Sequence, residues 1–235
     1  MKYRGVFALV LFFSLFSPVF AQGTEEGTHV YAIRGEVYVD FEPIYSGHVD
    51  SEYPLDVPKA GRRALEEAAL FFSAMIYGWS FYYEVGERAR LINEKLELEA
   101  VDEIKFGDPG LRVTDTEIKD MRLWVWMDYH LNAFQQRRMQ VWRSGSVRNA
   151  QAIGYAPNFI EEYPGWLGMR KIVLEDAARA ALRAMLRASE RNRPKEVTGF
   201  ICLASFPRYY IAGGRMATSA RFRVLVKEIV PYAAY

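Results

Sequence analysis

The stretch "IGYAPNFIEEYPGWLGMRKIVLEDAARAALRAML", from Ile153 to Leu186, most constrains the fold of this 235-residue chain. A short apolar segment, a proline and a loop lead into a long Ala-rich segment with helical periodicity. Alanine is the best helix former, and its small side chain lets a helix lie close to a neighbouring layer. The spacing predicts a helix from Leu167 to about Arg191. We expect its apolar face to cover a sheet, through Leu174, Ala177, Ala181 and Met185.

A looser version of the same passage, "VDFEPIYSGHVDSEYPLDVPKAGRRALEEAALFFSAMI", precedes it at Val39–Ile76. Leu65–Ala69 matches Leu174–Ala178, and "RLWVWMDYHL" and "ARFRVLVKEI" close the two copies. Each half is predicted to run strand, helix and then two or more strands. The pattern predicts an α+β fold of two related helix-on-antiparallel-sheet units, produced by duplication. The alternative is coincidence, which an Ala-rich composition favours.

Alternating apolar residues and turn residues predict the remaining elements. A strand is expected in Thr28–Tyr45, followed by a helix that begins at Lys59 and ends at Gly78. Ile92–Ile104 is compatible with either a strand or a helix. Gly107–Gly110 is a predicted turn, and Gly213–Gly214 a predicted hairpin turn. The other predicted strands are Trp79–Val85, Arg122–Leu131, Ala150–Ala156, Thr198–Ala204, Arg208–Ala212 and Arg215–Val230.

The first residues have the pattern of a secretory signal peptide. Lys2 and Arg4 precede the apolar run Val6–Phe16, and Val19 and Ala21 occupy the small-residue positions before a cleavage point. We expect cleavage before Gln22 and a periplasmic or otherwise exported protein; an uncleaved anchor is the alternative. The predicted organisation is therefore residues 1–21 as signal peptide, 22–131 as the first α+β unit, 132–149 as a basic connector and 150–235 as the second unit.

Charge and cysteine content exclude some functional classes. The formal net charge of +1 becomes −1 when Lys2 and Arg4 are removed, so no nucleic acid partner is expected. Hydrophobic residues make up 51% of the chain, which predicts a packed protein. The single cysteine, Cys202, cannot form a disulfide within the chain, and its apolar surroundings predict a buried, inert side chain.

One predicted strand carries the best candidate for a ligand site. Trp124, Trp126, Asp128 and His130 alternate with apolar residues and therefore lie on one face. Two indoles, a carboxylate and an imidazole could bind a small ligand. The alternative is an aromatic face that packs under a helix or a subunit. None of the three histidines has a metal-ligand spacing, so no metal and no cofactor is expected.

The connector is basic, with no acidic residue between Asp128 and Glu161. Arginines with interleaved apolar residues suit an acidic partner, an anionic membrane surface or a cell-wall polymer. The predicted contact residues are Arg137, Arg138, Trp142, Arg143 and Arg148. The alternative is a short amphipathic helix that packs Phe134, Met139 and Trp142 on the domain and leaves the arginines outside.

The second half carries the pattern A-x-G-Y-A-P, then R-K-x-x-L-E-D-A-A-R-A-A-L-R-A-M-L, then Gly199-Phe200-Ile201 at the start of a strand. Over about Val147–Val230 it resembles the twenty-kilodalton envelope lipoprotein family and the N-terminal domain of flagellar assembly protein T. The resemblance implies an Ala-rich helix on a small antiparallel sheet and an envelope structural or assembly role without catalysis. The chain departs from the family in having no lipid-attachment cysteine and no aromatic after the second Ala pair.

These observations predict an exported, non-enzymatic structural or assembly protein of the bacterial envelope that acts through protein–protein contacts. The alternative is a periplasmic small-ligand-binding protein that uses the Trp124, Trp126 and His130 strand face. A hydrolase is the third possibility, but Glu161 and Glu162 are adjacent and point apart, and no partner carboxylate is identified. The sequence has no Gly-rich phosphate loop, serine elbow or Cys–His pattern.

Overall fold

A computed structural model describes residues 31–43, 53–84, 86, 93–159, 163–189 and 195–231. The predicted signal peptide, Glu161 and Glu162 lie outside these ranges. The chain has the predicted α+β architecture, with three helices and antiparallel sheets in the described part. The elements are β1 (Ala32–Asp40), α1 (Val57–Ile76), β2 (Trp79–Glu84), β3 (Lys95–Ala100), β4 (Leu111–Lys119), β5 (Arg122–His130), α2 (Ala133–Val141), β6 (Arg148–Tyr155), α3 (Gly165–Ser189), β7 (Glu196–Leu203), β8 (Arg208–Ala212) and β9 (Arg215–Val230).

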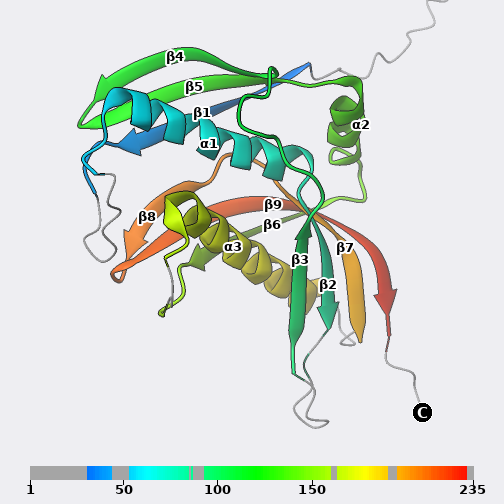
Figure 1. The fold of residues 1–235 in the computed structure, drawn as a ribbon. Coiled ribbons are helices and arrows are strands. Elements are labelled where there is room, and N and C mark those ends of the chain that lie inside the picture. Colours follow the sequence, from blue (N-terminus) through cyan, green and yellow to red (C-terminus); the bar gives the residue numbers. More distant parts are fainter. Residues whose placement is uncertain are drawn as a thin grey trace, which may run out of the picture.

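The strands form two sheets (Figure 1). The first has three strands in the order β1-β5-β4, and the second has the order β3-β2-β7-β9-β6, with β8 paired to β9. All pairs are antiparallel. In the second sheet β2 pairs with β7, and Trp79 lies opposite Ile201. One sheet therefore takes strands from both halves of the sequence.

Helix α1 runs between the two sheets (Figure 1) and contacts β1, β5 and β7. The Asp56 carboxylate accepts a hydrogen bond from the Lys59 amide at 2.8 Å, and Pro58 fits the first turn, where no amide donor is needed. The helix ends before Gly78, whose φ of +64° suits glycine. Among the described helices, none combines the length and apolarity needed to cross a membrane.

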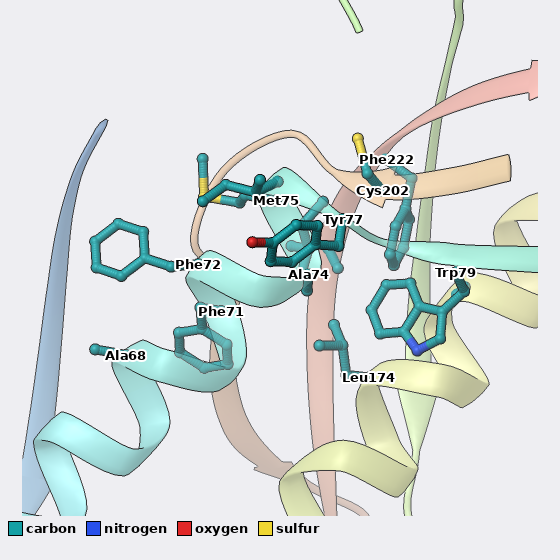
Figure 2. Close-up of a cluster of buried hydrophobic side chains, with 14 of the residues drawn as sticks. Ala68, Phe71, Phe72, Ala74, Met75, Tyr77, Trp79, Leu174, Cys202 and Phe222 are labelled. Carbon is teal, nitrogen blue, oxygen red and sulfur yellow. The ribbon is translucent and has the colours of Figure 1, made fainter. Parts of the chain in front are cut away.

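Figure 2 shows the part of the core where α1, α3 and the second sheet meet, and the same cluster continues to Val37 of β1 and Val125 of β5. Phe72 and Ile76 of α1 are fully buried, as are Leu174 of α3 and Phe222 of β9. Cys202 is buried here as predicted, and burial raises the pKa of its thiol to about 12. The thiol therefore stays protonated at neutral pH, which suits a small core side chain.

Helix α3 covers the sheet with the predicted face. Leu174, Ala177 and Ala181 are buried, and Met185 is half-buried against the core. The helix packs on β6 and β9. The Asp176 side chain of α3 also accepts a hydrogen bond from the Tyr155 amide of β6 at 2.9 Å, which connects the helix to the edge of the sheet. The Ala-rich face thus allows the close packing that the sequence indicates.

The connector contains helix α2, in agreement with the alternative prediction of a short helix that packs on the domain. Met139 and Trp142 are buried, whereas Phe134 is 53% exposed and does not pack as predicted. Asn132 and Gln135 form a reciprocal capping box at the start of the helix. The end of the connector, Arg148–Asn149, already belongs to β6.

Two segments needed the structure for their assignment. Lys95–Ala100, within the ambiguous stretch, is strand β3 and pairs with β2. Leu111–Lys119 is strand β4, which the sequence did not predict. Apart from half-buried Leu111, every residue of β4 is exposed, so no burial on either face imposes an alternating pattern.

The two halves share part of their topology. In the first, β5 lies between β1 and β4; in the second, β9 lies between β6 and β8. The strands that follow the helices differ, because β7 pairs with β9 whereas β2 pairs with β3 and β7 instead of β5. The predicted identical strand order is therefore not reproduced throughout, and duplication stays a prediction.

Candidate functional site

The four predicted ligand residues lie on the outer face of the three-stranded sheet. Strand β5 buries Leu123, Val125, Met127 and Tyr129 on its inner face, against which α1 packs. On the outer face Trp124 and Trp126 are half-exposed and His130 is exposed. The strand alternates as predicted, because its two faces meet core and solvent.

Each of three outer-face residues has a partner on the neighbouring strand β1. The Tyr38 and Trp124 rings are 5.0 Å apart. The Trp126 indole donates to Glu36 at 2.9 Å, and Asp128 forms an ion pair with Arg34 at 3.2 Å. Cross-strand pairing thus occupies the groups that a ligand would need. As a small-ligand site this face stays a prediction.

The predicted contact residues of the connector separate into two groups. Arg137, Arg143 and Arg148 are exposed, so an acidic partner could reach them. Arg138 and Trp142 instead serve the end of α1: the guanidinium donates to Tyr77 O at 3.0 Å and the indole to Ile76 O at 3.0 Å. These two donors satisfy carbonyls that the helix leaves without an internal partner. Partner contact by this set stays a prediction.

Strand β4 presents an uncovered surface, which we call the β4 edge and define by Val113, Thr116, Ile118 and Met121. The first three lie opposite Met127, Val125 and Leu123 of β5, so they continue the inner face of the sheet beyond the part that α1 covers. Val113 is 47% exposed, Ile118 59% and Met121 63%. Figure 1 shows β4 on the far side of β5 from β1.

The backbone of β4 is also accessible. Among the described strands it pairs only with β5, which leaves its other side without a strand neighbour. Its outward-facing side chains carry two negative charges between two positive ones: Arg112, Asp115, Glu117 and Lys119. An accessible strand edge with apolar residues on one face is a template for pairing with another extended segment.

A cavity of about 170 Å³ lies where the beginnings of α1 and α3 meet the β8–β9 hairpin. We call it the Glu67 cavity. Its charged and amide lining residues are Asp40, Arg63, Glu67, Asn158, Arg170 and Arg215. Its aromatic and apolar wall comes mainly from Tyr53, Tyr163, Trp166, Met169 and Met216. Polar groups that converge in an apolar hollow are typical of small-ligand sites.

Glu67 is 2% exposed and forms an ion pair with Arg170, whose Nε lies 3.0 Å from Oε1. The second oxygen, Oε2, has no hydrogen-bond partner among the described residues. Burial raises the pKa of Glu67 to about 7; the positive charge of Arg170 works against this rise, and the negative charge of Asp40 adds to it. A perturbed buried carboxyl in a cavity is typical of functional sites.

Aromatic rings hold the arginines of the cavity in place. The Arg63 guanidinium lies 5.0 Å from the centroid of Tyr53 and 5.2 Å from that of Trp166. Arg170 lies 4.4 Å from the Tyr209 ring, and the Tyr209 hydroxyl donates to Arg170 O at 2.9 Å. Such stacking favours the charged guanidinium and restricts its movement.

The sequence patterns above did not predict the Glu67 cavity. A signal was present, because Glu67 lies three residues after Ala64 and four before Phe71, on the apolar stripe of α1. A carboxylate on such a stripe must find a buried partner or a functional role. Its neighbour Glu66 is half-exposed and forms an ordinary i, i+4 pair with Arg62 at 2.9 Å.

A second cavity, of about 270 Å³, lies between α1, α3 and the segment that includes Ile104 and Phe106, and its lining is mainly apolar. No group of three or more His, Cys, Asp or Glu side chains in the described part could hold a metal ion.

Comparison with known proteins gives the family setting. A protein-family model matches residues 20–232. An uncharacterized protein of Treponema pallidum (strain Nichols) is 24% identical over 221 residues, which cover 87% of this chain and 90% of that protein. No solved structure matches the chain.

Proposed function

The chain belongs to the family whose model matches residues 20–232, and we propose that it is an exported, non-enzymatic structural or assembly protein of the bacterial envelope. It acts through protein–protein contacts. The signal-peptide pattern before Gln22 supports export. The likeness of the second half to the twenty-kilodalton envelope lipoprotein family and to flagellar assembly protein T supports the envelope role. The Treponema relative supports a bacterial setting.

The observation that carries the contact role is the β4 edge. Its exposed Val113 and Ile118 continue the inner face of a sheet that α1 covers only in part, and exposed Met121 lies in the turn that follows β4. An extended segment of a partner protein would pair with the β4 backbone as a fourth strand and cover these side chains. The charges of Arg112, Asp115, Glu117 and Lys119 on the outer face would favour a segment with complementary charges.

Site-specific photo-crosslinking in the cells that make the protein tests this contact. A photoreactive amino acid at Ile118 is expected to give one discrete adduct, and the same group at Val141 of α2, which is also about half exposed, is expected to give none. Thr116→Lys should abolish the Ile118 adduct, because a lysine there opposes the approach of another strand. An adduct of twice the chain mass would identify a second copy as the partner. Equal crosslinking from Ile118 and Val141 would contradict the proposal.

Export has a separate test. Mass spectrometry of the protein recovered from the envelope fraction should give a mature N-terminus at Gln22, because signal peptidase cleaves after small residues such as Val19 and Ala21. When exported proteins are released selectively from the cells, the cleaved protein should be found in the released fraction. Protein that begins at Met1 and stays in the cytoplasmic fraction would contradict export, whatever the result at the β4 edge.

A further inference from the structure

We propose that the Glu67 cavity binds a small zwitterion that carries a cationic nitrogen beside a carboxylate, as a free α-amino acid does. The site is independent of the β4 edge, since it lies between α1, α3 and the β8–β9 hairpin and shares no residue with that edge. Three features lead to this ligand: the unpartnered oxygen of Glu67, the donors of Arg215 and the size of the cavity.

Glu67 defines the cationic end of the ligand. A buried carboxylate oxygen without a hydrogen bond is destabilising, because it has lost water and gained no partner. Arg170 Nε lies 3.0 Å from Oε1, and Oε2 is buried without a hydrogen-bond partner among the described residues, although Glu67 lines the cavity. An ammonium group has three donors and a positive charge, so it would satisfy Oε2 and favour the ionised carboxylate.

Arg215 defines the anionic end. It lines the same cavity from the hairpin, and its Nη1 donates to Asn158 Oδ1 and Ala156 O. A guanidinium has five donors in a planar fork, which leaves others for a ligand carboxylate. The Tyr155 ring lies 5.1 Å from its Cζ and fixes its position.

Charged groups of both signs in the lining suit a zwitterion. Arg170 compensates Glu67, Asp40 is paired with Arg122 at 2.7 Å, and Arg63 and Arg215 add positive charge to the lining. A simple anion would bring a second negative charge to Glu67, and a simple cation would bring a positive charge to the arginines. A molecule with both charges leaves the balance unchanged and places each charge near its opposite.

The volume limits the ligand to a small molecule. A cavity of about 150 Å³ accommodates benzene, so the 170 Å³ of the Glu67 cavity suits about six to ten non-hydrogen atoms. Trp166, Met169 and Met216 provide an apolar wall that would contact a short side chain. Leucine, with an ammonium, a carboxylate and an apolar side chain, fits these limits.

Calorimetric titration of the full mature chain with the free L-amino acids tests the proposal. Two leucine derivatives test the contribution of each charged group: N-acetylleucine lacks the ammonium and leucinamide lacks the carboxylate. At least one amino acid is expected to bind with a Kd of about 1 mM or tighter, and removal of either charged group from a bound amino acid should weaken binding about tenfold or more.

Variants assign the site. Glu67→Gln and Arg215→Gln should each weaken binding about tenfold or more, whereas Glu228→Gln, at an exposed position of β9, should leave it unchanged. Circular dichroism and melting midpoints establish that each variant is folded, and Arg215→Gln keeps the test valid should Glu67→Gln unfold. The proposal is overturned by any of three results: no L-amino acid binds up to about 10 mM, N-acetyl and free amino acid bind equally, or the folded variants bind as the parent does.

Discussion

Gly154 of β6 lies directly against the backbone of Ala177 in α3. A Cβ on Gly154 would lie 2.8 Å from Ala177 Cα and still closer to Ala177 N and Val173 O. These are backbone atoms, which cannot rotate away as the end of a flexible side chain can. Only glycine therefore permits this separation between helix and sheet, and the small Ala177 side chain lets the helix settle there.

Gly154→Ala should lower the free energy of unfolding by about 1–3 kcal/mol, because α3 must move away from β6. Gly61→Ala is the matched control, since a Cβ there meets nothing within 4 Å and alanine favours the helix. The control should be neutral or more stable by about 0.5–1 kcal/mol. Urea unfolding of both variants measures the difference; equal stability would show that α3 does not approach β6 so closely.

Ala181→Leu should destabilise the protein by about 1–3 kcal/mol through overpacking, since Ala181 is fully buried on the face of α3 that covers the sheet. Ala184→Leu, three residues further along the same helix and exposed, should change stability by less than about 0.5 kcal/mol. The melting midpoints of the two variants compare the buried face of α3 with its exposed face. An unchanged midpoint for Ala181→Leu would mean that this face is exposed.

Trp142→Phe should reduce stability by about 1 kcal/mol or more, because it removes the indole donor from Ile76 O and leaves space in the core. Trp126→Phe also removes an indole hydrogen bond, to Glu36, but in an exposed position where water replaces it. That control should lose less than about 0.5 kcal/mol in denaturant unfolding. Similar losses for both variants would argue against α2 as a cap for α1.

The raised pKa of Glu67 predicts a pH dependence of stability. Between its usual value of 4.5 and about 7, the folded state holds the Glu67 proton more tightly than the unfolded state does. The stabilisation from this proton is complete below about pH 4.5 and is lost as the pH rises through about 7. The parent should therefore lose stability relative to Glu67→Gln across this range. Unfolding free energies of the parent and variant at several pH values measure this; a constant difference would indicate an ordinary Glu67 pKa.

Several features of the candidate site could not come from the sequence. The carboxyl of Glu67 meets Arg170, more than 100 residues further along the chain, and Arg215 lies further still. Within α1, Glu66 and Glu67 are the same residue type, and only the packing of α1 against α3 and the hairpin decides which is buried. The outer face of β5 could be predicted because the alternation of its residues is local. Its partners on β1 could not be predicted, because they come from a distant part of the chain.

The sequence by itself determined the elements with strong local patterns. Helical spacing predicted α3 and its buried face, alternation predicted β5 and β9, and Gly213–Gly214 predicted the β8–β9 turn. These succeed because burial on one side of an element imposes a period on its residues. The tertiary structure alone decided that β2 joins β7, that β4 is an exposed edge strand, and that Arg138 and Trp142 cap α1. Contacts between distant segments leave no such period, because each depends on where the whole chain places both partners.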